Sequence, residues 1–331
     1  MKLINNDEIS LEAWKSLIEV SPFASPFQTP DFYKLFNSVE GFSAKVIAVA
    51  DEEKLQALVV ITLQKEPGIK GFFSRRGIIY GGPLIKNGYS NALELLLKEM
   101  QRPLLKEVIY LETRNFFDFS PFKEIFLNLG WNYTPYLNYQ LQTKERDFML
   151  QNVSDSRMRQ IRKAMKSGVT WSEATKIEEV DVFYNILSTL YKTKIRKPLL
   201  PLGFFQTFFT HQIGKFLLVN FQGKIIGGIM CPVTEGKAIY EFYICGLDQD
   251  FKEQYPSVMA TWAAMEYANQ HQIPMFDFMG AGIPGKEYGV REFKARFGGE
   301  LVEHGRFIKV LNPFLYGLGQ AVLKVLAKLP K

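Results

Sequence analysis

The sequence predicts a mixed α/β (α+β) protein built from two consecutive domains. Three observations support this: a length of 331 residues, a composition of 47% hydrophobic and 22% charged residues, and an order of strand-like and helix-like segments that occurs twice. Chains of this length commonly form two domains, and the composition is that of an ordinary globular protein. Each half has the order hairpin, long strand, helix, strand, helix, strand, which favours a mixed, mostly antiparallel sheet flanked by helices.

The first half begins with a helical segment and a proline-punctuated aromatic loop at 21–30. Residues 45–50 and 55–63 are rich in β-forming residues and are separated by a short polar turn, which is a hairpin signal. The other segments expected in this half are helix 11–20, helix 31–38, strand 76–85, helix 91–100, strand 108–112, helix 121–129 and strand 138–143.

The second half repeats this order, although residue identity between the halves is negligible. Its segments are strands 216–221, 225–233 and 238–245, helix 257–270, strand 274–278, helix 289–297 and strand 307–311. The sequence therefore predicts a first domain over 1–148 and a second over 149–311. The apolar segment 312–331 has leucines and valines at helical spacing, with Lys324, Lys328 and Lys331 among them. This amphipathic helix either completes the first domain or lies on an anionic membrane surface.

The charge and the cysteine content limit which partners and which cellular compartment are expected. The net charge of +6 favours anionic partners such as nucleic acid, phosphorylated small molecules or an anionic membrane. Cys231 and Cys245 lie in separate apolar runs, and with three scattered histidines they form no metal-ligand spacing. The N-terminal residues lack an apolar signal-peptide core. We expect a cytoplasmic protein without a metal or resident cofactor, or one that is peripheral at the inner face of the membrane.

The stretch 276–299 is the strongest candidate for a functional site. A short apolar strand ends in Asp277, a glycine-rich loop containing Gly280 follows, and a predicted helix then carries Arg291, Lys294 and Arg296. Glycine lets a backbone approach a ligand closely, and a strand, a glycine loop and a basic helix can together hold an anion. The alternative is that the loop only turns the chain and that the cations lie in solvent.

Two basic clusters lie between the halves. Arg159, Arg162, Lys163 and Lys166 fall on one face of a predicted helix, and residues 192–197 add four cations before a Pro-Leu-Leu-Pro segment. The second cluster supplies Lys194, Arg196 and Lys197. Such faces are either solvated or neutralised by a bound anion, and phosphate is the anion that we expect.

Four motifs resemble the Fem family of aminoacyltransferases, which build peptidoglycan interpeptide bridges on a two-domain fold of the GNAT acyltransferase type. The motifs lie at residues 25–30, 157–169, 276–280 and 292–299. The match departs from the family at Leu35, where members carry a lysine. The segment from Tyr80 through Gly81, Gly82 and Pro83 resembles an acetyltransferase-like branch.

The resemblance implies roles for individual residues. Lys294 would stabilise the oxyanion formed when an ester is attacked, and Phe293 would line the same place. Asp277 and Gly280 would shape the acceptor site, and Arg196 would meet the diphosphate of the precursor. The remaining substrate-binding candidates are Arg291, Lys197, Lys194, Arg159, Arg162 and Tyr80.

Three functions remain open on the sequence. The first is transfer of an amino acid from aminoacyl-tRNA to a nucleotide-linked or lipid-linked muropeptide precursor. The second is acyl-CoA-dependent N-acylation of a sugar amine or lipid-linked glycan, which the acidic, glycine-poor loop 246–256 disfavours, because acyl-CoA enzymes of this fold hold pyrophosphate there. The third is a non-catalytic protein that binds a glycan precursor at the membrane.

Overall fold

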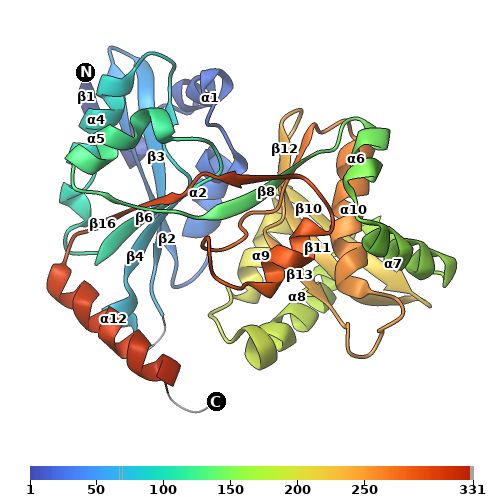
Figure 1. Cartoon of the computed structure of the whole chain (residues 1–331). Coiled ribbons are helices and arrows are strands. Elements are labelled where there is room, and N and C mark those ends of the chain that lie inside the picture. Colours follow the sequence, from blue (N-terminus) through green and yellow to red (C-terminus); the bar gives the residue numbers. More distant parts are fainter. Residues whose placement is uncertain (67, 69, 329–331) are drawn as a thin grey trace. The chain divides into compact units, whose positions relative to one another are not determined.

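The computed structural model describes residues 1–66, 68 and 70–328, and these form two compact α/β units. Unit 1 contains residues 1–135 and the segment from 304 onward, and unit 2 contains residues 136–303. Both units consist of a mixed sheet flanked by helices, as the sequence predicts (Figure 1).

Unit 1 has a sheet with the strand order β1-β2-β3-β4-β6-β16-β7, and β5 pairs with β3. Its strands are β1 (Lys2–Asn5), β2 (Ser43–Asp51), β3 (Lys54–Gln64), β4 (Arg76–Gly81), β5 (Leu84–Ile85), β6 (Tyr110–Asn115), β7 (Asn132–Thr134) and β16 (Arg306–Val310). Its helices are α1 (Leu11–Val20), α2 (Pro30–Asn37), α3 (Lys70–Ser74), α4 (Ser90–Glu99), α5 (Lys123–Asn128) and α12 (Pro313–Lys328). Short 3-10 turns lie at Asn6–Glu8, Pro26–Gln28, Arg102–Leu104 and Ser120–Phe122.

The core of unit 1 follows from the alternation of β2 and β3. Side chains such as Ile47, Val49 and Val59 point to one face, where they pack with Leu93 and Leu96 of α4. Helix α2 contacts β2 and β3 as well, and its Phe32 and Phe36 side chains are fully buried. The hairpin thus has apolar residues on both faces because a helix covers each of them.

Unit 2 has the strand order β15-β8-β14-β12-β11-β10-β9, and β13 pairs with β11. Its strands are β8 (Leu137–Gln142), β9 (Thr170–Glu173), β10 (Gly214–Phe221), β11 (Lys224–Thr234), β12 (Ala238–Tyr240), β13 (Tyr243–Gly246), β14 (Met275–Asp277) and β15 (Glu300–Glu303). Its helices are α6 (Arg146–Asn152), α7 (Asp155–Lys166), α8 (Ile177–Leu190), the π-helix η5 (Tyr191–Ile195), α9 (Leu202–Thr210), α10 (Pro256–Gln270) and α11 (Gly289–Ala295).

The two sheets share one topology, and each contains a strand from outside its own half of the sequence. The parallel pair β4–β6 in unit 1 corresponds to the parallel pair β12–β14 in unit 2. The next strand is β16 in unit 1 and β8 in unit 2. The expected domain ranges are therefore wrong at both boundaries. Residues 136–148 fall in unit 2 because β8 pairs with β14 and β15, and residues 304–311 fall in unit 1 because β16 pairs with β6 and β7.

Candidate functional site

The predicted glycine loop follows β14 directly, and Asp277 fixes its first residues. The Asp277 side chain is buried and accepts hydrogen bonds from Asn138 Nδ2 at 2.8 Å, Gln140 Nε2 at 2.9 Å and the Met279 amide at 2.7 Å. Met279 and Gly280 both have positive φ angles, of 53° and 114°. Asp277 therefore holds the loop against β8, and its carboxylate is directed to groups of the protein.

Two cations of α11 hold the rest of this loop through its carbonyl oxygens. Lys294 Nζ donates to Phe278 O and, at 3.0 Å, to Gly280 O. The guanidinium of Arg291 donates to Ala281 O at 2.7 Å, Lys286 O at 3.0 Å and Ile283 O. We call residues 278–286, held in this way, the stapled loop. The alternative in which both cations lie in solvent is thereby excluded.

Lys294 also forms a buried ion pair that the sequence analysis did not predict. Its Nζ lies 3.0 Å from Glu241 Oε1, and the two side chains are only 8% and 4% exposed. Burial raises the pKa of Glu241, and the nearby Lys294 ammonium opposes this rise. An ammonium has three N–H donors, and here three protein oxygens accept them. In this conformation an oxyanion would reach Lys294 only by replacing one of these oxygens.

Phe293 lies beside the same centre and packs against Arg157. The Arg157 guanidinium is 4.5 Å from the ring centroids of both Phe293 and Phe297, and it donates to Phe293 O at 3.0 Å. Burial and the nearby Arg296 lower the pKa of Arg157 to about 10. Arg157 is 3% exposed, so it anchors α11 to α7 and is separated from the exposed basic cluster that follows it on α7.

The outer face of α7 carries the other cations of that cluster. Arg159, Arg162 and Lys166 are exposed and make no ion pair with any residue in the described part of the chain. Lys163 instead pairs with Glu253 at 3.0 Å. Arg159, Arg162 and Lys166 lie on the side of α7 opposite to Arg157, so this row of charge faces away from α11.

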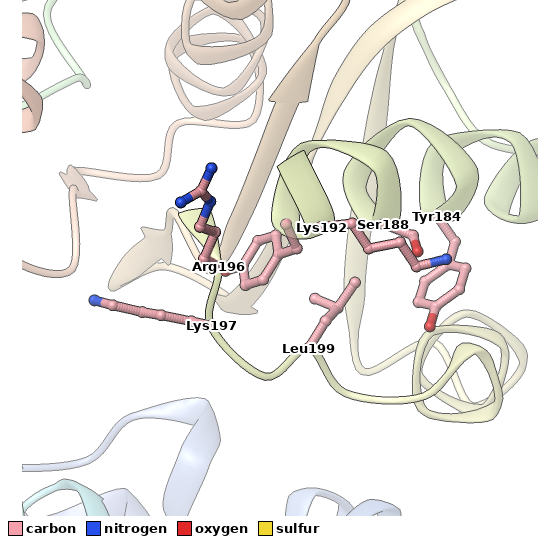
Figure 2. Close-up of a pocket in the computed structure, with 7 residues that line it drawn as sticks. Tyr184, Ser188, Lys192, Arg196, Lys197 and Leu199 are labelled. Atoms are coloured by element: carbon pink, nitrogen blue, oxygen red, sulfur yellow. The ribbon is translucent and has the colours of Figure 1, made fainter. Parts of the chain in front are cut away.

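The second basic cluster borders a pocket of about 400 Å³ at the end of α8. The lining residues are Tyr184, Ser188, Tyr191, Lys192, Arg196, Lys197 and Leu199. Figure 2 shows Arg196 and Lys197 on one side of this pocket and Tyr184 with Ser188 on the other. Arg196 has the left-handed backbone angles φ 53° and ψ 38° at the end of η5. π-Helices and left-handed non-glycine residues are both enriched at functional sites.

The pocket and the Lys294 centre meet through one short segment of unit 2. The ring of Tyr191, which lines the pocket, lies 6.1 Å from the ring of Tyr243. Tyr243 begins β13, two residues after Glu241, the partner of Lys294. Tyr191 therefore links the wall of the pocket to the segment that also carries Glu241.

Two predicted residues lie elsewhere. Lys194 is exposed and is not among the residues that line the pocket. Tyr80 lies in unit 1, where it is buried, stacks on Phe27 with ring centroids 5.3 Å apart, and has Arg114 over its ring at 5.3 Å.

The loop before α10 carries its own anion at the helix N-terminus. Asp248 Oδ1 accepts from the Ser257 amide at 3.0 Å, and Oδ2 accepts from the Ser257 hydroxyl at 2.5 Å. Amide groups at a helix N-terminus are the ones that bind phosphate when it is present. Here the carboxylate of Asp248 already binds one of these amides, that of Ser257.

Three other features that carry function are metal ligands, reactive thiols and membrane-spanning helices. The described residues contain no cluster of three or more His, Cys, Asp or Glu suited to a metal ion. Cys231 and Cys245 are buried free thiols, and burial raises the pKa of both. Within the described part of the chain, no helix has the length and apolar character needed to cross a membrane.

The architecture is a tandem GNAT-like fold. It resembles a tandem GNAT protein from the clavulanic acid biosynthesis pathway, with 12% identity, 94% of this chain and 99% of that chain covered, and a TM-score of 0.57. The L-PGS structure from Bacillus licheniformis is similar as well, with 10% identity, 94% and 96% coverage and a TM-score of 0.58.

The more particular likeness is to the Fem proteins. The model of the FemAB family matches residues 230–324, which include Glu241, the stapled loop and Lys294. The crystal structure of FemX superposes with a TM-score of 0.72 at 15% identity, covering 96% of this chain and 99% of FemX. The chain is therefore FemAB-like. A comparison with curated protein sequences gave no match.

Proposed function

We propose that the protein is an acyltransferase that forms an amide on an amine acceptor, moving an amino acid from aminoacyl-tRNA to a peptidoglycan (muropeptide) precursor. The observation that carries this proposal is the FemAB match over residues 230–324, since it falls on the Lys294 centre. The Fem resemblance of the sequence motifs implies the same reaction class. In the reaction, the acceptor nitrogen bonds to the ester carbonyl carbon, the bond to the ribose oxygen breaks, and that oxygen takes the proton lost by the amine.

Lys294 has two roles in this proposal. Its three hydrogen bonds hold the stapled loop and Glu241 in place, so that its first role is to position the site. For the second, an oxyanion would take the place of Gly280 O as acceptor for Nζ. A fixed cation at a developing oxyanion is worth about 2.7–4 kcal/mol in enzymes where one donor has been removed.

The exposed charges of unit 2 favour a polyanionic donor. Arg159, Arg162 and Lys166 offer a row of cations on the outer face of α7, which suits the phosphates of a tRNA backbone. Arg196 and Lys197 border a separate pocket that suits the diphosphate of the acceptor. Acyl-CoA is the weaker alternative, because Asp248 occupies the helix N-terminus where its pyrophosphate would bind.

The test is to supply isotopically labelled donors separately. The protein is incubated with charged tRNA or with acetyl-CoA, each with a nucleotide-linked or a lipid-linked muropeptide, and transfer of label to the acceptor is measured. We expect transfer from charged tRNA. Transfer from acetyl-CoA alone would refute the proposal in favour of CoA-dependent acylation. Precursor binding without transfer from either donor would show a non-catalytic binding protein.

A charge variant sharpens the test. Replacing Arg159, Arg162 and Lys166 together by glutamine should raise KM for tRNA and leave kcat unchanged. The slope of log affinity against log salt should fall by about two to three, because three phosphate contacts are lost. Lys224→Gln, at an exposed position of another hairpin, serves as the control. Equal salt slopes for the variant and the control would remove α7 from donor binding.

A further inference from the structure

Helix α12 presents an apolar face that unit 1 does not cover. Its residues 313–323 contain no charged side chain. Phe314 is 78% exposed and Leu318 is 39% exposed, and their i, i+4 spacing puts them on one side of the helix. The ring of Tyr316 instead packs against Tyr110, at 5.3 Å between centroids. A helix on the surface of a protein ordinarily carries polar or charged residues on its outer side.

Helix α3, which contacts α12, adds two aromatic side chains to this face. Phe72 is 55% exposed and Phe73 is 37% exposed, and their rings pack edge to face at 5.1 Å. The guanidinium of Arg75 lies 5.2 Å from the Phe72 ring centroid and donates to Lys106 O at 3.0 Å. We call Phe72, Phe73, Phe314 and Leu318 the aromatic patch; a cation borders it directly.

The charge of these segments is of one sign. Residues 304–331 contain no Asp or Glu, and their cations are Arg306, Lys309, Lys324, Lys328 and Lys331. Residues 67–76 also lack acids and carry Lys70, Arg75 and Arg76. Arg306 is paired with Glu112, and the segments still carry more cations than acids. Exposed aromatic and aliphatic side chains combined with an excess of cations match the interface of an anionic bilayer. A second copy of the chain fits less well, because it would bring like charges together.

We propose that the aromatic patch on α3 and α12 docks the protein on the surface of an anionic lipid membrane. The apolar side chains enter the boundary between head groups and acyl chains, and the cations meet the anionic head groups. No described helix is long and apolar enough to cross a membrane, so α12 would lie on the surface. Figure 1 shows α12 as a separate helix on the outside of its unit. This inference does not depend on acyl transfer, and binding to vesicles is measured without any substrate.

The experiment is flotation of the full chain with unilamellar vesicles. One set contains equal parts of phosphatidylglycerol and phosphatidylcholine, and the other contains phosphatidylcholine alone. The key variant is the double replacement Phe72→Ser with Phe314→Ser. Because both rings are exposed, their loss should leave the thermal unfolding temperature unchanged. Phe148→Ser is the matched control, since Phe148 is 50% exposed on α6 of unit 2.

We expect the native chain and Phe148→Ser to float with the anionic vesicles and to stay behind with phosphatidylcholine alone. The double variant should bind at least about tenfold more weakly, since two apolar anchors are lost. A charge-reversed variant, Lys324→Glu with Lys328→Glu, should weaken binding in the same way. Failure of the native chain to float, or equal binding of the double variant and the Phe148 control, would overturn the proposal. So would a concentration-dependent dimer that the double variant abolishes while vesicle binding stays intact.

Discussion

Replacing Lys294 by methionine tests whether the buried ion pair organises the site. The substitution keeps most of the side-chain volume but leaves Glu241 buried without its cation, and it leaves the carbonyls of Phe278 and Gly280 without this donor. Removing one partner of a buried pair costs about 3–5 kcal/mol. We expect the free energy of unfolding of unit 2 to fall by about this amount.

The measurement is urea unfolding combined with hydrogen exchange of the α11 amides, because exchange assigns the loss to one part of the molecule. The double variant Glu241→Gln with Lys294→Met should recover part of the loss, with a coupling energy of about 2 kcal/mol. Lys163→Met is the control, since its ion pair with Glu253 is exposed. Such surface pairs contribute about 0–1 kcal/mol.

Acid should relieve the defect in Lys294→Met. Burial raises the pKa of Glu241 above its ordinary value of 4.5, and loss of Lys294 removes a charge that opposes this rise. The folded state then binds the proton more readily than the unfolded state, so that stability increases as pH falls towards 4.5. A loss smaller than about 1 kcal/mol at neutral pH, or strictly additive effects in the double variant, would refute the role of the pair.

Two further predictions concern the anchoring of each unit. Burial would raise the pKa of Glu112, but Arg114 and Arg306 outweigh it and lower this pKa below 4.5. The contribution of Glu112 to stability is therefore present above pH 4.5 and lost as the pH falls below it. Glu112→Gln should make the thermal unfolding temperature less dependent on pH in that range. A pH dependence equal to that of the native chain would contradict this. Arg157→Met should destabilise unit 2 by about 3 kcal/mol, because it loses two ring contacts and two hydrogen bonds. Arg159→Met should have an effect within about 0.5 kcal/mol, and equal unfolding energies of the two variants would argue against the anchor.

The sequence was most informative where the residues of the site are close along the chain. Asp277, Phe293 and Lys294 lie within one strand, loop and helix, and their local pattern predicted a common centre. Glu241 was missed because its link to Lys294 depends on the pairing of β12 with β14. An acid inside the apolar strand-like run 238–245 was the available signal, since a buried carboxylate needs a partner.

The exchange of strands explains why the domain boundaries could not be predicted. Local alternation identified the strand segments 138–143 and 307–311 correctly as elements, but it does not name the partner of a strand. In the structure β8 pairs with β14 and β15, and β16 pairs with β6 and β7. Such pairing is decided by side-chain packing across distant segments. The role of Arg157 was not predicted for a similar reason, because the sequence does not show that Phe293 and Phe297, far along the chain, cover it.

The fold alone does not identify the donor of the proposed acyl transfer. The choice depends on what each anion-binding position of unit 2 already holds. The N-terminus of α10 is capped by Asp248, so a pyrophosphate there would have to displace a carboxylate and then lie beside it. The outer face of α7 presents Arg159, Arg162 and Lys166 to solvent, where a polyanion gains by releasing counterions. A donor with an extended phosphate backbone would bind the exposed cations of α7 without displacing Asp248. A donor whose pyrophosphate binds at the N-terminus of α10 would first have to displace that carboxylate.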